Sequence, residues 1–186
     1  MTVRWVAETD PMDWLWVLMV AGGTSRVMAR ISEMPFAVPL EPQKLLSLVL
    51  VAGPIAGLVL IFGVGRLLHW MLGRMGGTGT WIASRTAVTW ALAPSVPSLA
   101  LWAIMIAGYG VKVLSPSVID EATDPAEVLI LSLDYLVQFA LMAWSLVLEI
   151  VCLAEVHRLS AWRVVLAELV LGAGVLLLAL ILFFLL

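Results

Sequence analysis

The sequence predicts an all-α integral membrane protein with about five transmembrane helices, the third of them kinked by proline. Of the 186 residues, 63% are hydrophobic and 12% are charged, whereas a soluble domain is about half apolar and about a quarter charged. The mean hydropathy of +1.10 agrees with a chain that lies in a bilayer. Disorder is excluded by the same composition, because disordered chains are poor in apolar residues.

Five apolar stretches follow one another, and a helix needs about 20 such residues to cross the hydrocarbon core. Residues 12–31 come first and carry Arg26 and Arg30 near their end. We interpret this stretch as a short span, with a helix lying on the membrane surface as the alternative. The later stretches are residues 45–72, 81–111, 128–156 and 162–186. We expect a short cytoplasmic arm at residues 1–11 and a single membrane domain at residues 12–186.

The third stretch, residues 81–111, contains Pro94 and Pro97. Each proline removes a backbone donor and crowds the preceding turn, so a kink or break is expected there. It is interpreted either as a structural kink or as a discontinuous helix that lines a substrate path.

Basic residues predict the orientation, because positive loops favour the cytoplasm. With five spans, six arginines fall on one side: Arg4, Arg66, Arg74, Arg85, Arg158 and Arg163. Four basic residues fall on the other side: Arg26, Arg30, Lys44 and Lys112. The amino terminus, which lacks the pattern of a signal peptide, is therefore expected inside and the carboxyl terminus outside. If residues 12–31 only lie on the surface, the amino terminus moves outside.

Three sequence motifs carry a resemblance to a known family. GRMGGTGTW (residues 73–81), the following WALAP (residues 90–94) and LAEVHRLSAWRVVLA (residues 153–167) resemble the Yip-one family of Ypt/Rab-interacting membrane proteins, in its short bacterial form. The resemblance implies five spans, a cytoplasmic amino terminus and a bacterial inner membrane location. Eukaryotic members bind small GTPases through a long cytosolic amino-terminal region. Because this chain has only a short arm there, GTPase binding is not expected.

The glycine-rich stretch GRMGGTGT has two interpretations. It lacks the lysine of a nucleotide-binding loop and lies between helices, so it is read as a tight turn. Alternatively, its amides and a nearby arginine hold a lipid headgroup phosphate. The candidate residues are Arg74, Gly76, Gly77, Thr78 and Gly79.

Charged residues inside the spans are the best candidates for a site, because a charge in hydrocarbon must be paired or hydrated. Arg66, Arg85, Glu149 and Glu168 fall at similar depths and are expected to form one intramembrane layer. This layer is either a clamp that holds the bundle together or a relay for protons or ions. On the outer side, Lys112 and Asp134 are expected to form a similar pair.

The remaining motifs suggest helix packing rather than catalysis. Small residues in AGPIAG (residues 52–57) and GAG (residues 172–174) permit close helix approach, within the bundle or with a partner. No catalytic residue, cofactor or metal site is expected. The net charge of −3 without a basic run excludes nucleic acid as a partner.

We therefore expect a non-enzymatic membrane scaffold or accessory protein. Its partners would be other integral membrane proteins, phospholipids or further copies of the same chain. The alternative is a small transporter or channel component that uses the charged layer.

Overall fold

The computed structural model of the chain describes residues 12–33, 42–114, 118 and 122–185, and these are helical almost throughout. The predicted arm at residues 1–11 lies outside the described residues. The elements are α2 (Met12–Glu33), α3 (Pro42–Leu58), the π-helical η1 (Val59–Val64), α4 (Gly65–Arg74), α5 (Trp81–Ala91), α6 (Ser95–Tyr109), the 3₁₀ turn η2 (Gly110–Leu114), α8 (Pro125–His157) and α9 (Ala161–Leu185).

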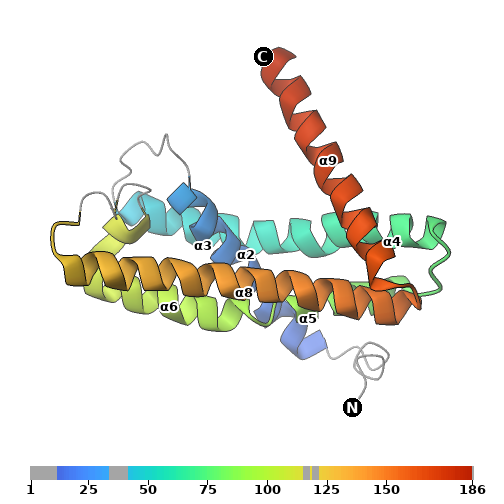
Figure 1. Ribbon diagram of the computed structural model, residues 1–186, viewed down its shortest axis with the longest axis horizontal. Coiled ribbons are helices and arrows are strands. Elements are labelled where there is room, and N and C mark those ends of the chain that lie inside the picture. Colours follow the sequence, from blue (N-terminus) through green and yellow to red (C-terminus); the bar gives the residue numbers. More distant parts are fainter. Residues whose placement is uncertain (1–11, 34–41, 115–117, 119–121, 186) are drawn as a thin grey trace.

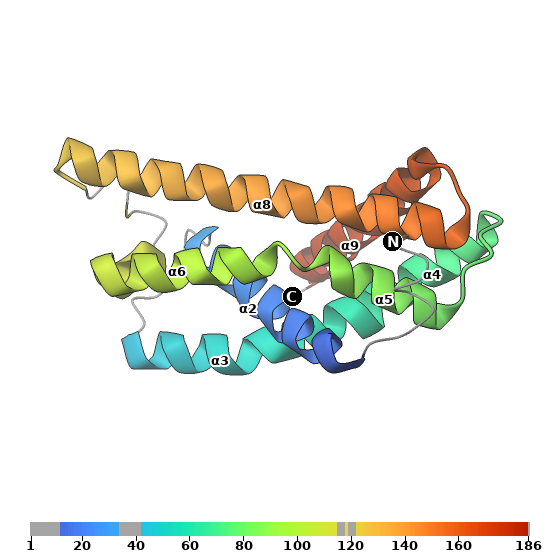
Figure 2. The ribbon, with the colours of Figure 1, turned by 90° about the horizontal axis from the view of Figure 1, so that it is seen from below.

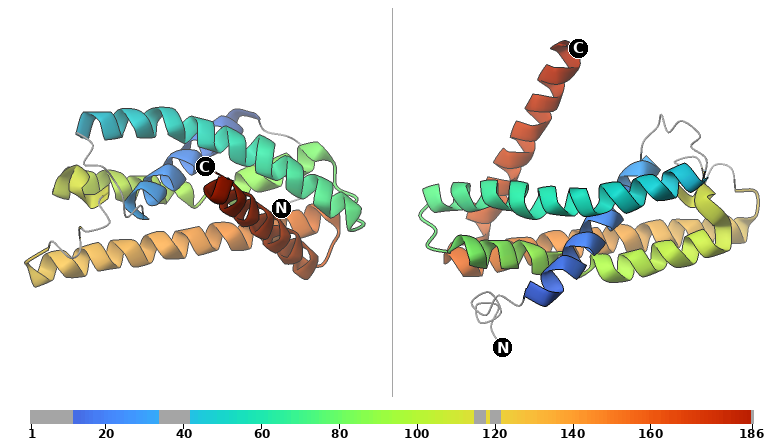
Figure 3. Two further views of the ribbon diagram at one scale, coloured as in Figure 1. Left: turned by 90° about the horizontal axis from the view of Figure 1, so that it is seen from above. Right: turned by 180° about the vertical axis from the view of Figure 1, so that it is seen from behind.

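Three long rods lie side by side: α3 continued by η1 and α4, α5 continued by α6, and α8 (Figures 1 and 2). Helix α2 crosses them obliquely and packs against α3, α5 and α6. Helix α9 packs mainly against the neighbouring ends of α4 and α8 and then projects away from the rods (Figure 3).

Four helical stretches are long and apolar enough to cross a membrane: Lys44–Arg74, Trp81–Leu114, Pro125–His157 and Ala161–Phe184. They coincide within three residues at each end with the four longer predicted spans. Helix α2 has 22 residues but is not among these four. The all-helical membrane architecture is therefore confirmed, while the fifth span stays a prediction.

The helix ends are encoded locally. Thr80 precedes α5 and its hydroxyl accepts a hydrogen bond from the backbone N–H of Ala83 at 3.3 Å. Asp124 does the same for α8, accepting from Ala126 N at 3.0 Å, and Pro125 follows at the first helical position. These side chains satisfy amides that a helix leaves free at its start. Arg158 closes α8 in the left-handed conformation, with φ of 54°.

The helix is interrupted at the proline-containing stretch. Helix α5 ends at Ala91, the next three residues form a turn, and α6 begins at Ser95. Within the turn, Ser95 N donates to Leu92 O at 2.8 Å, which is a tighter pattern than an α-helix. Pro94, which has no N–H to donate, stands at the end of this turn and precedes α6.

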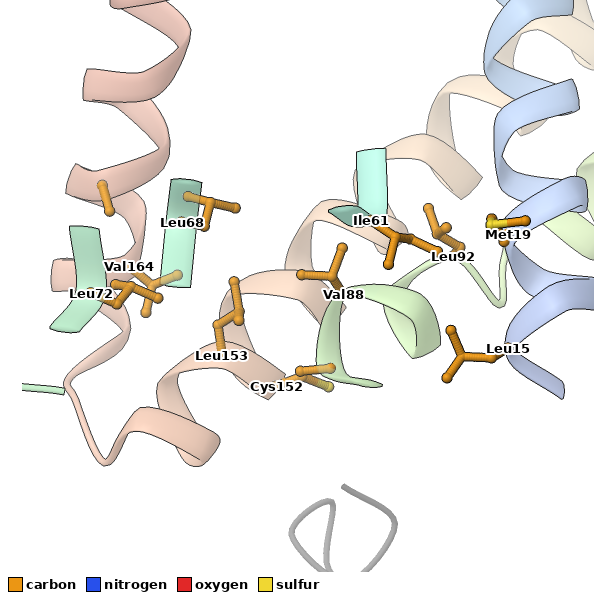
Figure 4. Close-up of a cluster of buried hydrophobic side chains, with 12 residues drawn as sticks. Leu15, Met19, Ile61, Leu68, Leu72, Val88, Leu92, Cys152, Leu153 and Val164 are labelled. Atoms are coloured by element: carbon orange, nitrogen blue, oxygen red, sulfur yellow. The ribbon is translucent and has the colours of Figure 1, made fainter. Parts of the chain in front are cut away.

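Two apolar clusters form the core. The first lies where α4, α5, α8 and α9 meet and includes Leu68, Leu72, Leu153 and Val164, each at most 1% exposed (Figure 4). Cys152 is buried in the same cluster, where it acts as a small apolar side chain. The second cluster surrounds Trp102 and joins α2, α3, α6 and α8.

The contact between α2 and α3 depends on glycine. A Cβ atom added to Gly23 would collide with the carbonyl oxygen of Gly53, and one added to Gly57 would collide with the carbonyl oxygen of Met19. The backbones of the two helices therefore touch, which only a residue without a side chain permits. The AGPIAG motif thus serves packing within the bundle.

Helix α9 contrasts with this. Beyond Leu171 its described side chains are all exposed, and nothing lies within 4 Å of a Cβ added to Gly172 or Gly174. The second small-residue motif is therefore not used for packing within the described part of the chain.

Candidate functional site

The glycine turn between α4 and α5 is folded against the end of α8. Gly76 has φ of +90°, which favours glycine, and a Cβ added to Gly79 would lie 2.8 Å from Val156 Cγ1. Two turn amides bond within the chain: Gly77 N donates to Leu72 O at 2.9 Å, and Thr78 N donates to His157 O at 3.1 Å. These amides are thus occupied, and the geometry is that of a tight turn.

The arginines near this turn also contact the protein itself. The Arg74 guanidinium lies 4.8 Å from the ring centre of Trp70, and Arg163 Nη1 donates to Met75 O at 3.1 Å. Arg74 is exposed and keeps access to the surroundings. A lipid phosphate at Arg74, Gly76, Gly77, Thr78 and Gly79 therefore remains a prediction, with Gly77 and Thr78 unable to offer their amides without breaking a bond.

Beneath the turn, a serine joins two histidines that the sequence analysis did not single out. Ser84 Oγ lies 3.0 Å from His69 Nδ1, 2.8 Å from His157 Nε2 and 3.0 Å from Thr80 O. A hydroxyl has one donor and two acceptor lone pairs. All three contacts are satisfied when Ser84 donates to Thr80 O and accepts from both imidazole N–H groups.

This Ser84 cluster ties α4, α5 and α8 together. Ser84 and His157 are 0% exposed, and the two imidazole centres lie 5.4 Å apart. Because the hydroxyl is enclosed and has no spare hydrogen-bonding capacity, the cluster acts as a buried polar clamp at this end of the bundle.

The intramembrane charges are arranged differently from the predicted layer. Glu149 of α8 and Glu168 of α9 influence each other electrostatically. The cation that acts on Glu149 is Arg26 of α2, which the prediction did not include. Arg66 is exposed and lies over the Trp81 ring, 5.0 Å from its centre. Arg85 is half-buried on α5, the helix that packs along α8.

The predicted outer pair of Lys112 and Asp134 needs a correction. Lys112 Nζ binds Glu127 Oε1 at 2.9 Å. Lys112 lies in η2, beyond the end of α6, and so it meets the first turn of α8 rather than Asp134, two turns deeper. Asp134 interacts with Gln138 instead.

A polar pocket lies between α2, α6 and α8, beside the Pro94 turn. This α2–α6–α8 pocket has a volume of about 100 Å³. Each helix contributes one row of residues at helical spacing. The rows are Ser25, Ala29 and Ser32 of α2, Ser95, Ser98 and Trp102 of α6, and Asp134, Gln138 and Ser145 of α8.

Hydrogen bonds connect the three rows. The hydroxyls of Ser25 and Ser98 lie 2.7 Å apart, Ser98 Oγ donates to Gln138 Oε1 at 2.5 Å, and Gln138 Nε2 donates to Ser98 O at 3.3 Å. Two buried polar atoms of the lining have no hydrogen-bond partner among the described residues: Trp102 Nε1 and Asp134 Oδ1. Arg26, also in the lining, adds a cation.

No group of three or more His, Cys, Asp or Glu side chains suited to a metal ion occurs among the residues that the structure describes. The α2–α6–α8 pocket is therefore the main candidate site. It offers hydroxyls, the Arg26 cation, the carboxylates of Glu33 and Asp134, and an indole N–H beside the membrane interior.

Comparison with known protein families identifies the family of this chain. The Yip1 domain matches residues 2–185, which is nearly the whole chain. The chain belongs to the Yip1 family. No curated protein and no solved structure matches it. The Yip-one resemblance carried by the glycine turn and the α8–α9 turn is thereby confirmed, and the Yip1 protein described here is a membrane protein with apolar spanning helices.

The sequence contained a signal for the pocket that was not used. Ser25, Ala29 and Ser32, and likewise Ser95, Ser98 and Trp102, recur every three or four residues in otherwise apolar helices. Such rows place small polar groups on one helix face. A criterion based on charged residues does not single out these rows, because their members are mostly uncharged serines.

Proposed function

We propose that this Yip1 protein is a non-enzymatic scaffold or accessory protein of the bacterial inner membrane, which binds the transmembrane helix of another membrane protein through α9. In this proposal α2 completes five spans, the amino terminus is cytoplasmic and the carboxyl terminus faces outward. The single observation that carries the proposal is the open small-residue section of α9 at Gly172 and Gly174.

Helix α9 lacks a partner helix at Gly172 and Gly174 within the described chain. Helices in a bilayer associate mainly through close packing at small residues, because lipid tails are as apolar as leucine. In this chain the backbone of the opposite helix covers Gly23 of α2 and Gly57 of α3. Nothing in the described chain lies within 4 Å of a Cβ added to Gly172 or Gly174 of α9. Val164 and Ala167 near the base of α9 are buried in the first core cluster and keep that end at the bundle, and the apolar remainder extends beyond it.

The proposal is tested by replacing the α9 glycines with leucine. Cells expressing the full chain, with a photo-reactive residue at position 176 of α9, are irradiated and the products separated by mass. We expect a defined protein adduct that is lost in the Gly172→Leu, Gly174→Leu double variant, because leucine side chains prevent the close approach of a partner helix.

Gly108→Leu is the matched control. Gly108 is also a helical glycine with nothing within 4 Å of an added Cβ, but it lies on α6. Its variant is expected to keep the adduct. Adducts with lipid only, or a protein adduct that survives the double α9 substitution, would refute the scaffold role.

A second candidate is a small transporter or channel component, and the α2–α6–α8 pocket is the observation that favours it. The pocket adjoins the helix break at Pro94, and it contains Arg26, which interacts with Glu149. Broken helices beside polar cavities are typical of substrate paths. In proteoliposomes, ion or proton flux that is abolished by Glu149→Gln but kept in Glu155→Gln would support this function over the scaffold.

A further inference from the structure

The α2–α6–α8 pocket extends along α8 from Ser145, near the middle of that helix, to Asp134, which lies nearer the membrane surface. Helix α8 has 33 residues, which at 1.5 Å per residue is about 50 Å, so about 10 Å extends beyond each side of a ~30 Å core. Asp134 comes nine residues after Pro125, or about 13 Å along the helix. It therefore lies only a few ångströms inside the hydrocarbon boundary, within reach of lipid headgroups.

Beside its polar row, α8 also lines the pocket with larger side chains that face outward. Tyr135, Phe139 and Met142 line the pocket, and they are 61%, 59% and 56% exposed. In a bilayer, such side chains contact acyl chains. The pocket thus has a polar interior beside a lipid-facing apolar surface, which suits an amphiphile whose polar end enters while its tails stay in the bilayer.

Two polar groups inside the pocket have no hydrogen-bond partner in the described part of the chain: one is a donor and the other is an acceptor. Trp102 is 5% exposed and its indole N–H has no acceptor among the described residues, while Asp134 Oδ1 there has no donor. A buried polar group without a partner is costly, so such atoms point to a bound molecule. The missing molecule must offer an acceptor to the indole and a donor to the carboxylate.

The charges narrow the chemistry further. Arg26, which also acts on Glu149, supplies a cation for an anionic group. Asp134 supplies a carboxylate for a cationic group, whereas Glu33, the other carboxylate of the lining, is paired with Arg30 at 3.2 Å. The Ser25 and Ser98 hydroxyls and Gln138 are bonded to one another and form a polar wall between α2, α6 and α8. A zwitterion with a phosphate and a primary ammonium group satisfies both ends, because the ammonium carries N–H donors for the carboxylate.

We propose that the α2–α6–α8 pocket binds the phosphoethanolamine headgroup of a phospholipid, with its phosphate at Arg26 and the Trp102 N–H and its ammonium at Asp134. A choline headgroup is a poor ligand because its trimethylammonium has no N–H to donate and needs more space. A glycerol headgroup is poor because it leaves Asp134 without a cation. This inference goes beyond the proposed function and does not depend on α9.

The test uses the full chain, purified in detergent and freed of lipid. Native mass spectrometry measures the binding of phosphatidylethanolamine, phosphatidylcholine and phosphatidylglycerol with identical acyl chains, and of free O-phosphoethanolamine. We expect phosphatidylethanolamine to bind roughly tenfold more tightly than the other two lipids, because only it makes charge-assisted bonds at both ends. Equal binding of all three lipids overturns the proposal.

Two variants locate the site. Asp134→Asn is expected to weaken phosphatidylethanolamine binding roughly tenfold or more, and Trp102→Phe roughly two- to tenfold, because each removes one partner of the headgroup. The matched controls are Glu155→Gln and Trp144→Phe, whose side chains are exposed on α8 outside the pocket. Wild-type affinity in Asp134→Asn, or an equal loss in its control, contradicts the assignment.

Two further measurements distinguish the lipid from free O-phosphoethanolamine as the ligand, and the pocket proposal from the α9 proposal. Free O-phosphoethanolamine that binds as tightly as the lipid would overturn the lipid as ligand, since the tails would then contribute nothing. The Gly172→Leu, Gly174→Leu variant is expected to keep lipid binding, and Asp134→Asn is expected to keep the α9 adduct. Failure of one proposal is thereby distinguished from failure of the other.

Discussion

At the α2–α3 crossing, Gly23 and Gly57 are covered by the backbone of the opposite helix and Gly53 by Thr24, whereas Gly172 and Gly174 of α9 face open space. Both motifs are small residues in apolar helices, and both are suited to close helix packing. In the first region the chain supplies its own partner helix. In the second region the described chain supplies none, and the difference separates residues that build the bundle from residues available to another protein.

The largest effect is expected where the glycines are covered. Gly23→Ala places a methyl group against the Gly53 carbonyl, so the two helices must separate. We expect a loss of about 3 kcal/mol of unfolding free energy, from overpacking and the lost helix contacts. Unfolding in detergent micelles, followed by circular dichroism, measures this loss. A stability equal to that of the wild-type protein would show that the crossing is looser than described.

A smaller loss is expected at the Ser84 cluster, which supports the same bundle through hydrogen bonds. Ser84→Ala removes the hydroxyl that accepts from His69 and His157 and leaves buried polar groups without a partner. The expected cost is about 2 kcal/mol. Ser132→Ala on the exposed side of α8 serves as the control and should cost much less. Equal stabilities of the two variants would argue that the cluster is not a clamp.

At α9 a glycine substitution is expected to raise the unfolding free energy or leave it unchanged, rather than lower it. Gly172→Ala meets no atom within 4 Å, so the gain in helix propensity of up to about 1 kcal/mol is not opposed. The same unfolding measurement on purified protein should show equal or higher stability. A clear loss would mean that α9 packs against the bundle in the membrane protein as purified, which contradicts its availability to a partner.

The smallest effect is expected at the bundle end near η2. Lys112 and Glu127 form an ion pair whose side chains are 54% and 22% exposed. Partly exposed pairs contribute about 0.5 kcal/mol, and salt weakens them. Lys112→Gln should therefore lower stability slightly at low ionic strength and not at high ionic strength. A loss independent of salt would assign Lys112 a packing role instead.

The sequence predicted the features that depend on long apolar runs, but not those that depend on how helices cross. The four long spans follow from about 20 consecutive apolar residues each, which is a local property. Arg26 was expected only as a basic residue near the end of the first stretch, because its electrostatic interaction with Glu149 arises when α2 crosses the rods obliquely. Lys112 was matched with the wrong carboxylate for a similar reason, since η2 changes the chain direction after α6.

The candidate sites also differ in whether their residues are consecutive in the sequence or come from separate helices. The glycine turn was recognisable because Gly76 and its neighbours are consecutive. The Ser84 cluster joins residues 69, 84 and 157, and the α2–α6–α8 pocket joins three separate helices. Their members are ordinary serines, histidines and one tryptophan, and only the assembled bundle places unpartnered atoms of Trp102 and Asp134 beside the same pocket.

The most direct test of the account is a photo-crosslinking scan along residues 170–184 of α9 in the native membrane. If α9 binds a partner helix through its small residues, protein adducts should recur every three or four positions, on the face that Gly172 shares with Ala179, seven residues later. The other positions should give lipid adducts. Lipid adducts at every position of the scan would contradict the claim that α9 is a protein-binding helix.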